Sequence, residues 1–192
     1  LTLSLSNVRI NSALPRDTPQ YLARFHKVRA EVNPLSLIGD GPYEVADFRL
    51  SNGYVKPRVT KGLKVNYQIL KNPDTVSQNN EGTTPALDVA NITLTNINWD
   101  YRNEAQDEVY EVFSRELRLS GQLRQAGSRL TAKGKGLIKT LQIDGQSYVQ
   151  EKPFQLATTL AVDHEQTQYT LKQGALQLAG ADFTVKGSAT YQ

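Results

Sequence analysis

Several residue types are missing or scarce in this chain of 192 residues. It contains no cysteine and no methionine, one tryptophan and two histidines. Without cysteine there can be no disulfide, no thiolate metal site and no thiol nucleophile. No apolar run approaches the ~18–20 residues of a transmembrane helix, so we expect any membrane anchor to lie outside this chain. Because the sequence begins with Leu1 rather than methionine, we interpret it as an excised piece or a processed product.

Charge of one sign is not concentrated anywhere in the chain. The sequence has 22 Lys and Arg residues against 19 Asp and Glu residues, a net charge of +3. A nucleic-acid-binding protein would gather its basic residues together with aromatic ones, and here they are scattered. We therefore predict no nucleic-acid partner. The apolar content of 39% is modest, which favours an open sheet with much surface over a compact globule.

Alternation of apolar and polar residues is the main structural signal. Leu1, Leu3 and Leu5 alternate with small polar residues, a period of two that predicts a strand. Val8 and Ile10 then take the other parity, which predicts a bulge near residues 6–7. Six longer alternating segments follow in residues 87–192, with no helical pattern between them. Turn signals separate these segments, among them Asp144-Gly145 and Ala179-Gly180. Such a series predicts an antiparallel meander.

Turn-forming residues divide the first part of the chain. Pro34 should end the strand before it, because proline lacks the N–H that a strand ladder needs. Asn52-Gly53 predicts a type I′ hairpin turn between two strands. Pro57 indicates an edge or irregular strand, and we read residues 62–70 as one further strand.

The fold class that we predict is mainly β. It is a long antiparallel meander with little helix, forming a curved, partly open sheet or a sandwich with one apolar face. We divide the chain into an N-terminal β segment (1–70), a flexible polar loop or linker (71–86) and a C-terminal antiparallel meander (87–192). The two β parts could form one continuous sheet.

Residues with catalytic potential do not form a recognisable motif. His26 and His164 are far apart among polar residues, so we predict no metal site, no cofactor and no catalytic residue. Carboxylate pairs that could serve a glycosidase, Asp100 with Glu104 or Asp107 with Glu108, lie at a predicted turn, where acids usually serve solubility. Trp99 and Tyr101 could stack a ligand, although packing against the core is the commoner role of such aromatics.

Three quoted segments resemble the AsmA family of bacterial envelope proteins. They are "VRAEVNPLSLI" (28–38), "YEVADFRLSNGYV" (43–55) and "KGLKVNYQIL" (61–70). Together they are similar to that family's pattern of a strand with Pro-Leu, a strand ending in a turn, and a glycine–asparagine element. "ANITLTNINWDYRN" (90–103) is similar to the entry of the family's later segment.

What this resemblance implies is a non-enzymatic, periplasmic segment of a protein tethered to the inner membrane. AsmA-like proteins are similar to chorein-type bridge-like lipid transfer proteins, so the implied role is lipid transport or outer-membrane assembly and homeostasis. The implied partner is a phospholipid or another acyl lipid, and the parent protein's anchor would bind the membrane. The groove residues that we predict share the apolar parity of their strands: Leu3, Leu5, Leu156, Leu160, Val162, Leu176, Leu178, Phe183 and Val185. The alternative is a β-sandwich module that binds carbohydrate or protein.

Overall fold

The described residues form one sheet of 11 strands. The structure is a computed structural model, and it describes residues 1–14, 21–34, 43–67, 87–89, 91–123, 127–163 and 168–190. The strands are β1 (Thr2–Asn11), β2 (Tyr21–Val32), β3 (Tyr43–Val55), β4 (Arg58–Val59), β5 (Leu87–Val89), β6 (Asn91–Asn103), β7 (Glu108–Leu123), β8 (Gly127–Ile143), β9 (Gln146–Asp163), β10 (Gln168–Leu178) and β11 (Ala181–Thr190).

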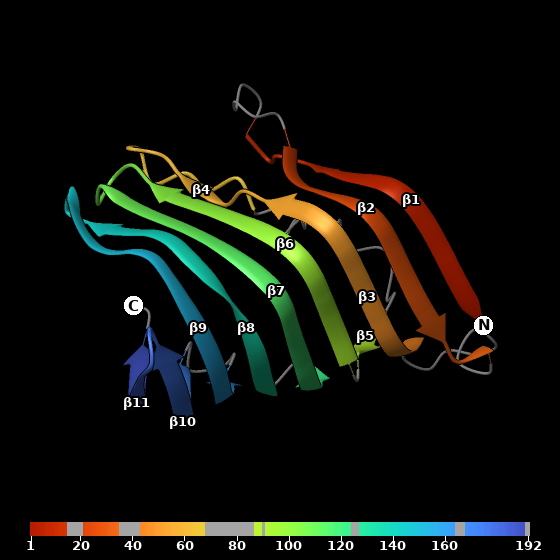
Figure 1. Cartoon of the computed structure of the whole chain (residues 1–192). Coiled ribbons are helices and arrows are strands. Elements are labelled where there is room, and N and C mark those ends of the chain that lie inside the picture. The colour runs from red at the N-terminus through yellow and green to blue at the C-terminus, as the bar shows by residue number, and fades with distance from the viewer. Residues whose placement is uncertain are drawn as a thin grey trace.

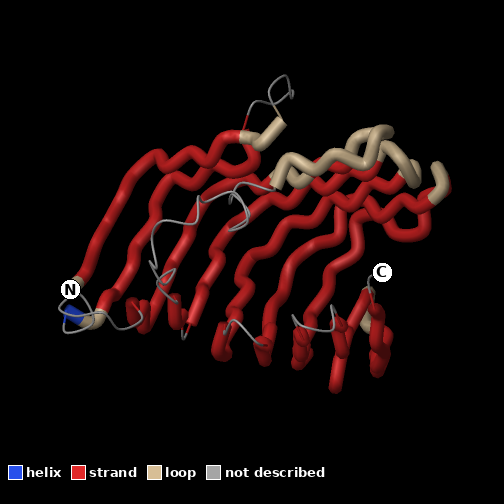
Figure 2. Tube along the Cα trace, turned by 180° about the vertical axis from the view of Figure 1, so that it is seen from behind, coloured by secondary structure: helices blue, strands red, loops and turns tan. Residues whose placement is uncertain are grey.

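The sheet is curved, with β1 at one edge and β11 at the other (Figure 1). Nine strands lie in the order β1-β2-β3-β6-β7-β8-β9-β10-β11, while β4 pairs with β6 and β5 pairs with β3. The strands bend partway along their length, and Figure 2 shows the same arch from behind. The predicted mainly-β class is confirmed, and the described strands form a single sheet rather than a sandwich.

The β3–β6 pair departs from the predicted meander because it is parallel. The other seven neighbouring pairs along the nine-strand path are antiparallel, so the sheet is mixed. A parallel pair needs a long connection between its strands, and residues 56–90 make that connection here. Strands from residues 1–70 and from residues 87–192 thus belong to one sheet. The predicted linker, 71–86, lies outside the described residues.

Two of the predicted turns have the backbone of type I′ hairpins. Asp144 and Gly145 join β8 to β9 with φ of 50° and 73°. Ala179 and Gly180 join β10 to β11 with φ of 51° and 87°. A type I′ turn needs positive φ at both central residues, which glycine adopts without steric cost.

The predicted hairpin at Asn52-Gly53 is wrong. Both residues lie inside β3, which continues from Tyr43 to Val55 without reversing. Asn52 does have the positive φ that its sequence indicated, 54°. The conformation serves a bend within the strand, because β3 is paired on both sides through this region. A Cβ atom at Gly53 would lie 2.4 Å from the carbonyl oxygen of Arg24, so a side chain does not fit there.

Three asparagines with the same backbone conformation form a line across the sheet. Asn7 in β1, Asn52 in β3 and Asn96 in β6 each have φ of 54°. The register places Asn52 beside Asn96 and puts His26 of β2 between Asn7 and Asn52. The Nδ2 of Asn96 donates a hydrogen bond to Oδ1 of Asn52 at 3.1 Å. The change of parity predicted near residues 6–7 occurs at Asn7, one member of this asparagine line, but the predicted bulge is wrong there. Ser6 pairs with Lys27 and Val8 with Phe25, so neither strand has an extra residue at this point, and the register between β1 and β2 shifts only between Ile10 and Asn11.

Residues 56–67 do not contain the strand predicted for 62–70. Pro57 separates β3 from the two-residue strand β4, in keeping with its predicted irregularity. Beyond β4, only an isolated bridge between Val59 and Val65 is formed, and residues 68–70 lie outside the described part of the chain. Asn66 secures this segment: its Oδ1 accepts a hydrogen bond from the Arg58 N–H at 2.8 Å, and its Nδ2 donates to the Lys56 carbonyl at 3.0 Å.

The buried core lies on one face of β2, β3 and β6. Its cluster consists of Ala23, Phe25, Val28, Leu50, Leu94 and Ile97. Half-buried apolar side chains from β1, β3, β6 and β7 pack around this cluster. The core is therefore a patch on one face of the sheet, and the strands on either side of it extend the same face outward.

Candidate functional site

An apolar row crosses all nine strands of the main path at one level of the sheet. Each member is directly paired with the next across the strands: Leu5, Val28, Leu50, Leu94, Leu117, Gly134, Leu156, Leu176 and Phe183. Because paired residues point to the same side of a sheet, these side chains share one face. We call this face the apolar face, and it also carries the core cluster.

A second apolar row lies two residues away along each strand. Its members are Leu3, Ala30, Phe48, Ile92, Leu119, Ala132, Thr158, Gly174 and Val185. Smaller residues, Ala132, Thr158 and Gly174, occupy the row in β8 to β10. The side-chain hydroxyl of Thr158 is buried and has no hydrogen-bond partner among the described residues. This part of the face therefore carries only small side chains, one of which, Thr158, is polar.

Burial varies strongly along the apolar face. Ile97, in the middle of the sheet, is 0% exposed. At the β1 edge, Leu3 and Leu5 are 51% and 59% exposed. At the β11 edge, Phe183 and Val185 are 48% and 42% exposed. The face is therefore a packed core in its centre and open to solvent at both edges.

The structure separates the predicted groove residues into two groups on this one face. Leu3 and Leu5 lie on β1. The others lie on β9 to β11: Leu156, Leu160, Val162, Leu176, Leu178, Phe183 and Val185. The backbone of Val162 pairs with Tyr169 and Ser128, and its side chain lies outside the described part of the structure. The β9–β11 group is contiguous, whereas the core lies between it and the β1 group.

Sequence reasoning missed several residues that complete the β9–β11 group. Phe154 is buried and pairs with Leu178 on one side and Gly136 on the other. Leu130 and Leu171 flank Leu160 on the neighbouring strands. All three share the parity of predicted residues or lie in predicted strands. The missing information was the register, which the sequence does not give.

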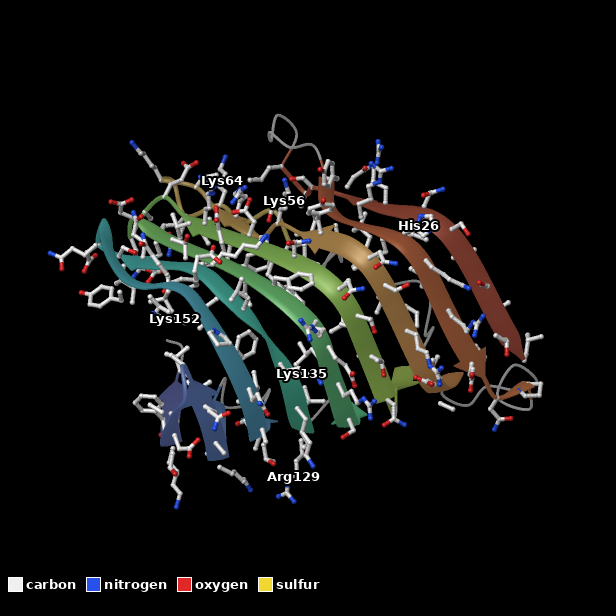
Figure 3. All side chains as sticks on the ribbon, viewed as in Figure 1. His26, Lys56, Lys64, Arg129, Lys135 and Lys152 are labelled. Carbon is white, nitrogen blue, oxygen red and sulfur yellow. The ribbon has the colours of Figure 1, made fainter. Side chains whose placement is uncertain are left out.

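The opposite face of the sheet is polar and hollowed. A hollow of about 720 Å³ is lined by β7 to β11, mostly by residues of the polar parity such as Glu116 and Arg118. Four members of the apolar row, Gly134, Leu156, Leu176 and Phe183, also line it. The larger share of polar-parity residues places the hollow mainly on the polar face. A neighbouring hollow of about 630 Å³ shares Arg118 and Lys133 with it. Arg118 forms an ion pair with Glu116, whereas the side chains of Lys133 and Lys135 form no ion pair with the described residues. Figure 3 labels Lys135 on its strand, β8.

Asp100 is held in an ion-pair network rather than beside a second free carboxylate. Both of its oxygens accept hydrogen bonds from Arg58, at 3.2 and 3.1 Å, and Arg102 donates from Nε at 3.1 Å. Burial by itself would raise the pKa of Asp100, but these hydrogen bonds outweigh it and the pKa is lowered. Arg102 also donates to Glu111 at 3.2 Å. The carboxylate is therefore ionised, and both of its oxygens are engaged by arginine side chains.

The other predicted carboxylates belong to the β6–β7 turn. The backbone N–H of Glu104 donates to the Val59 carbonyl at 2.9 Å, and a side-chain oxygen of Glu108 accepts from Asn103 at 3.3 Å. Asp107 has φ of 50°, and its carbonyl accepts from the Gly145 N–H at 3.3 Å. These contacts stabilise the hairpin ends.

Trp99 and Tyr101 contact their own sheet. The indole N–H of Trp99 donates to Oγ of Ser114 at 2.9 Å, and its ring packs against the core cluster. The ring of Tyr101 stacks on Tyr110 with centroids 5.2 Å apart and an interplanar angle of 17°. Burial is the largest cause of the raised pKa of Tyr101, followed by the charge of Glu108. These contacts favour the packing role over a ligand platform.

Neither histidine takes part in a cluster of potential metal ligands. His26 is exposed on β2 near the β1 edge (Figure 3), and His164 lies outside the described residues. Within the described ranges, there is no group of three or more His, Cys, Asp or Glu side chains that could hold a metal ion. A search of the same residues gives no helix that is both long and apolar enough to span a membrane.

Comparison of the chain with family models, curated proteins and solved structures found no significant match.

Proposed function

We propose that this chain is a non-enzymatic segment of an AsmA-like protein of the bacterial envelope, carrying acyl lipid on its apolar face. In this proposal it lies in the periplasm, within a parent protein that an anchor outside the chain tethers to the inner membrane. It would contribute to lipid transport or outer-membrane assembly. The observation that carries the proposal is the apolar row that continues without a polar side chain from Leu5 to Phe183.

The β8–β11 part of the apolar face has suitable dimensions for one acyl chain. Neighbouring strands lie about 4.8 Å apart, so four strands cover about 14 Å across the sheet. The hydrocarbon core of a bilayer is about 30 Å thick, which gives each acyl chain a reach of about 15 Å. A chain lying along Leu156, Leu176 and Phe183 would be held by burial alone, at about 0.8 kcal/mol for each methylene removed from water.

Adjacent residues of β10 offer a matched test of this proposal. Leu176 belongs to the apolar row, while its neighbour Ala175 has the opposite parity and points to the polar face; both residues are among those that line the hollow of about 720 Å³. Native mass spectrometry of protein purified from bacterial cells should show bound phospholipid on the wild type and on Ala175→Asp. Leu176→Asp should lose most of it, because a carboxylate would be placed in the path of the acyl chain.

The design separates lipid binding from folding. Circular dichroism and unfolding midpoints of the two aspartate variants establish whether each retains the sheet. Equal lipid retention by folded Leu176→Asp and Ala175→Asp proteins, or no lipid on the wild type, would refute the proposal. Either result would favour the alternative, a carbohydrate- or protein-binding module. A glycan array probed with the wild type and with Tyr101→Ala would test carbohydrate binding.

A further inference from the structure

Both edge strands of the sheet are long and unprotected. Within the described residues, β1 pairs only with β2 and β11 pairs only with β10, and each edge strand has 10 residues. Native sheets usually guard such edges with proline, charged residues or short strands, because unpaired N–H and C=O groups attract other strands. Neither strand contains proline; β1 has one charged residue, Arg9, and β11 has two, Asp182 and Lys186.

The apolar rows reach these edges in an exposed state. One row begins with Leu5 on β1 and finishes with Phe183 on β11, and the other begins with Leu3 and finishes with Val185. All four side chains are large hydrophobics that solvent reaches. Exposed apolar groups next to an open strand edge are an association site rather than ordinary surface.

The directions of the two edge strands are compatible with each other. Along the path from β1, every neighbouring pair is antiparallel except β3–β6. Following these alternations shows that β11 runs opposite to β1. If a second copy lies beside β11 with its β1 pointing the same way as β1 of the first copy, the two adjoining strands run in opposite directions. They would therefore form an antiparallel pair, which is the more stable kind.

The side chains also select one register for that pair. If each apolar row of one copy continues directly into the same row of the next copy, Leu5 lies opposite Phe183 and Leu3 lies opposite Val185. Ser4 then lies opposite Thr184 on the polar face. A slip of one residue would turn both leucines to the polar face. A slip of two would place one leucine opposite Gly187 or Ala181 and lose an apolar pair.

We propose that β1 of one copy adds to β11 of a second copy, in the register that pairs Ser4 with Thr184. The contact uses two different edges, so it leaves a free β1 and a free β11 and can continue into an open chain of copies. Main-chain hydrogen bonds supply the attraction and the two apolar pairs supply the register, as in other cases of strand addition. The proposal does not depend on lipid binding.

Engineered disulfides can test the register directly, because the chain has no cysteine of its own. Ser4→Cys and Thr184→Cys are made as separate proteins, both at exposed positions on the polar face. When the two are mixed under mild oxidation, a crosslinked dimer containing one chain of each should form rapidly. The matched control is Ser4→Cys mixed with Ser188→Cys, which lies four residues along β11, about 13 Å out of register.

A second pair of variants tests the same contact without oxidation. Sedimentation velocity of the wild type should show mass above the 21.4 kDa monomer as concentration rises. Leu3→Lys, which places a charge between the copies, should weaken association at least tenfold, and Ser4→Lys, on the polar side of the same strand, should weaken it less. A wild type that stays monomeric, equal crosslinking of the Thr184 and Ser188 pairs, or Ser4→Cys crosslinking mainly to itself would each overturn the proposal.

Discussion

The bend at Asn52 offers the sharpest test of the forces that shape this sheet. Asn52 has φ of 54° in the middle of β3, a conformation that costs ordinary L-residues about 1–2 kcal/mol and that asparagine tolerates. Its side-chain oxygen also accepts an exposed hydrogen bond from Asn96, worth about 0.5 kcal/mol. Asn52→Val forfeits both contributions, so we expect it to lower the free energy of unfolding by about 2 kcal/mol.

Two control substitutions isolate the backbone effect. Asn52→Asp keeps a short side chain that tolerates positive φ and can accept the bond from Asn96, so its stability should stay within about 0.5 kcal/mol of the wild type. Ser51→Val changes the preceding residue of β3, where no positive φ occurs. Valine fits extended backbone well, so this variant should be as stable as the wild type or slightly more stable.

Urea denaturation followed by fluorescence would measure these differences. Trp99 is the only tryptophan and packs against the core cluster, so its emission reports on the loss of the sheet. A change in midpoint with an unchanged slope reports a change in stability. Asn52→Val as stable as the wild type, or Ser51→Val as unstable as Asn52→Val, would show that the left-handed conformation does not govern this bend.

Other predictions concern the contacts around residues 56–67 and the close approach of β7 and β8. Asn66→Ala should lower the unfolding free energy by about 2–4 kcal/mol in the same assay. Asn66 is only 1% exposed, and the substitution removes the side chain that hydrogen-bonds the Arg58 N–H and the Lys56 carbonyl, so both groups are left unpaired in a buried place. The pKa of Asp100 is lowered in the folded protein, so its ionised carboxylate stabilises the fold at pH values above the ordinary pKa of 3.8. This stability is lost as the pH falls through the lower folded-state pKa. On acidification, the urea midpoint should therefore drop more for the wild type than for Asp100→Asn. Gly136→Ala should cost about 1–3 kcal/mol, since its Cβ would lie 2.0 Å from a backbone carbonyl oxygen of β7.

Local patterns in the sequence predicted most of the strands and their outward or inward parity. The alternation of Leu3 and Leu5 and the turn at Asp144-Gly145 both appear in the structure as predicted. Asn52-Gly53 was misassigned because positive φ at asparagine serves a hairpin and a mid-strand bend equally well. Only the continuous pairing of β3 with β2 and β6 distinguishes the two, and that pairing is not a local property.

Contacts between distant residues were beyond sequence reasoning. Arg58 and Asp100 are 42 residues apart and meet because β4 and β6 are parallel neighbours. The parallel β3–β6 pair has no signature in periodicity, since each strand alone alternates as an antiparallel strand would. The two sets of groove residues, on β1 and on β9–β11, could likewise be assigned a parity but not a distance from each other.

The asparagine line explains how the apolar face stays on one side along the bent strands. In β1, Leu5 pairs with Val28 and Val8 pairs with Phe25, and both partners belong to the buried cluster although Leu5 and Val8 have opposite parity. A change of parity must therefore occur between them, and Asn7 supplies it. The neighbouring strands must change at the same level, or apolar and polar side chains would meet across the pair.

At β7 the same change of parity is produced by an extra residue instead of a left-handed asparagine, and the asparagine line ends there. The register between β7 and β8 shifts between Ser114 and Glu116, so Arg115 is an extra residue on β7 alone. Ser114 and Leu117 thereby reach the apolar face, while β8 keeps regular alternation through Gly136 and Gly134. Of the nine strands on the main path, three thus carry a left-handed asparagine on this line, and the other six cross its level without a left-handed residue on it. Deleting Arg115 would remove the extra residue and reverse the parity of β7 on one side of the bend. Its apolar side chains there would then point to the polar face and its polar side chains to the apolar face, which should destabilise the sheet far more than any single substitution on either face.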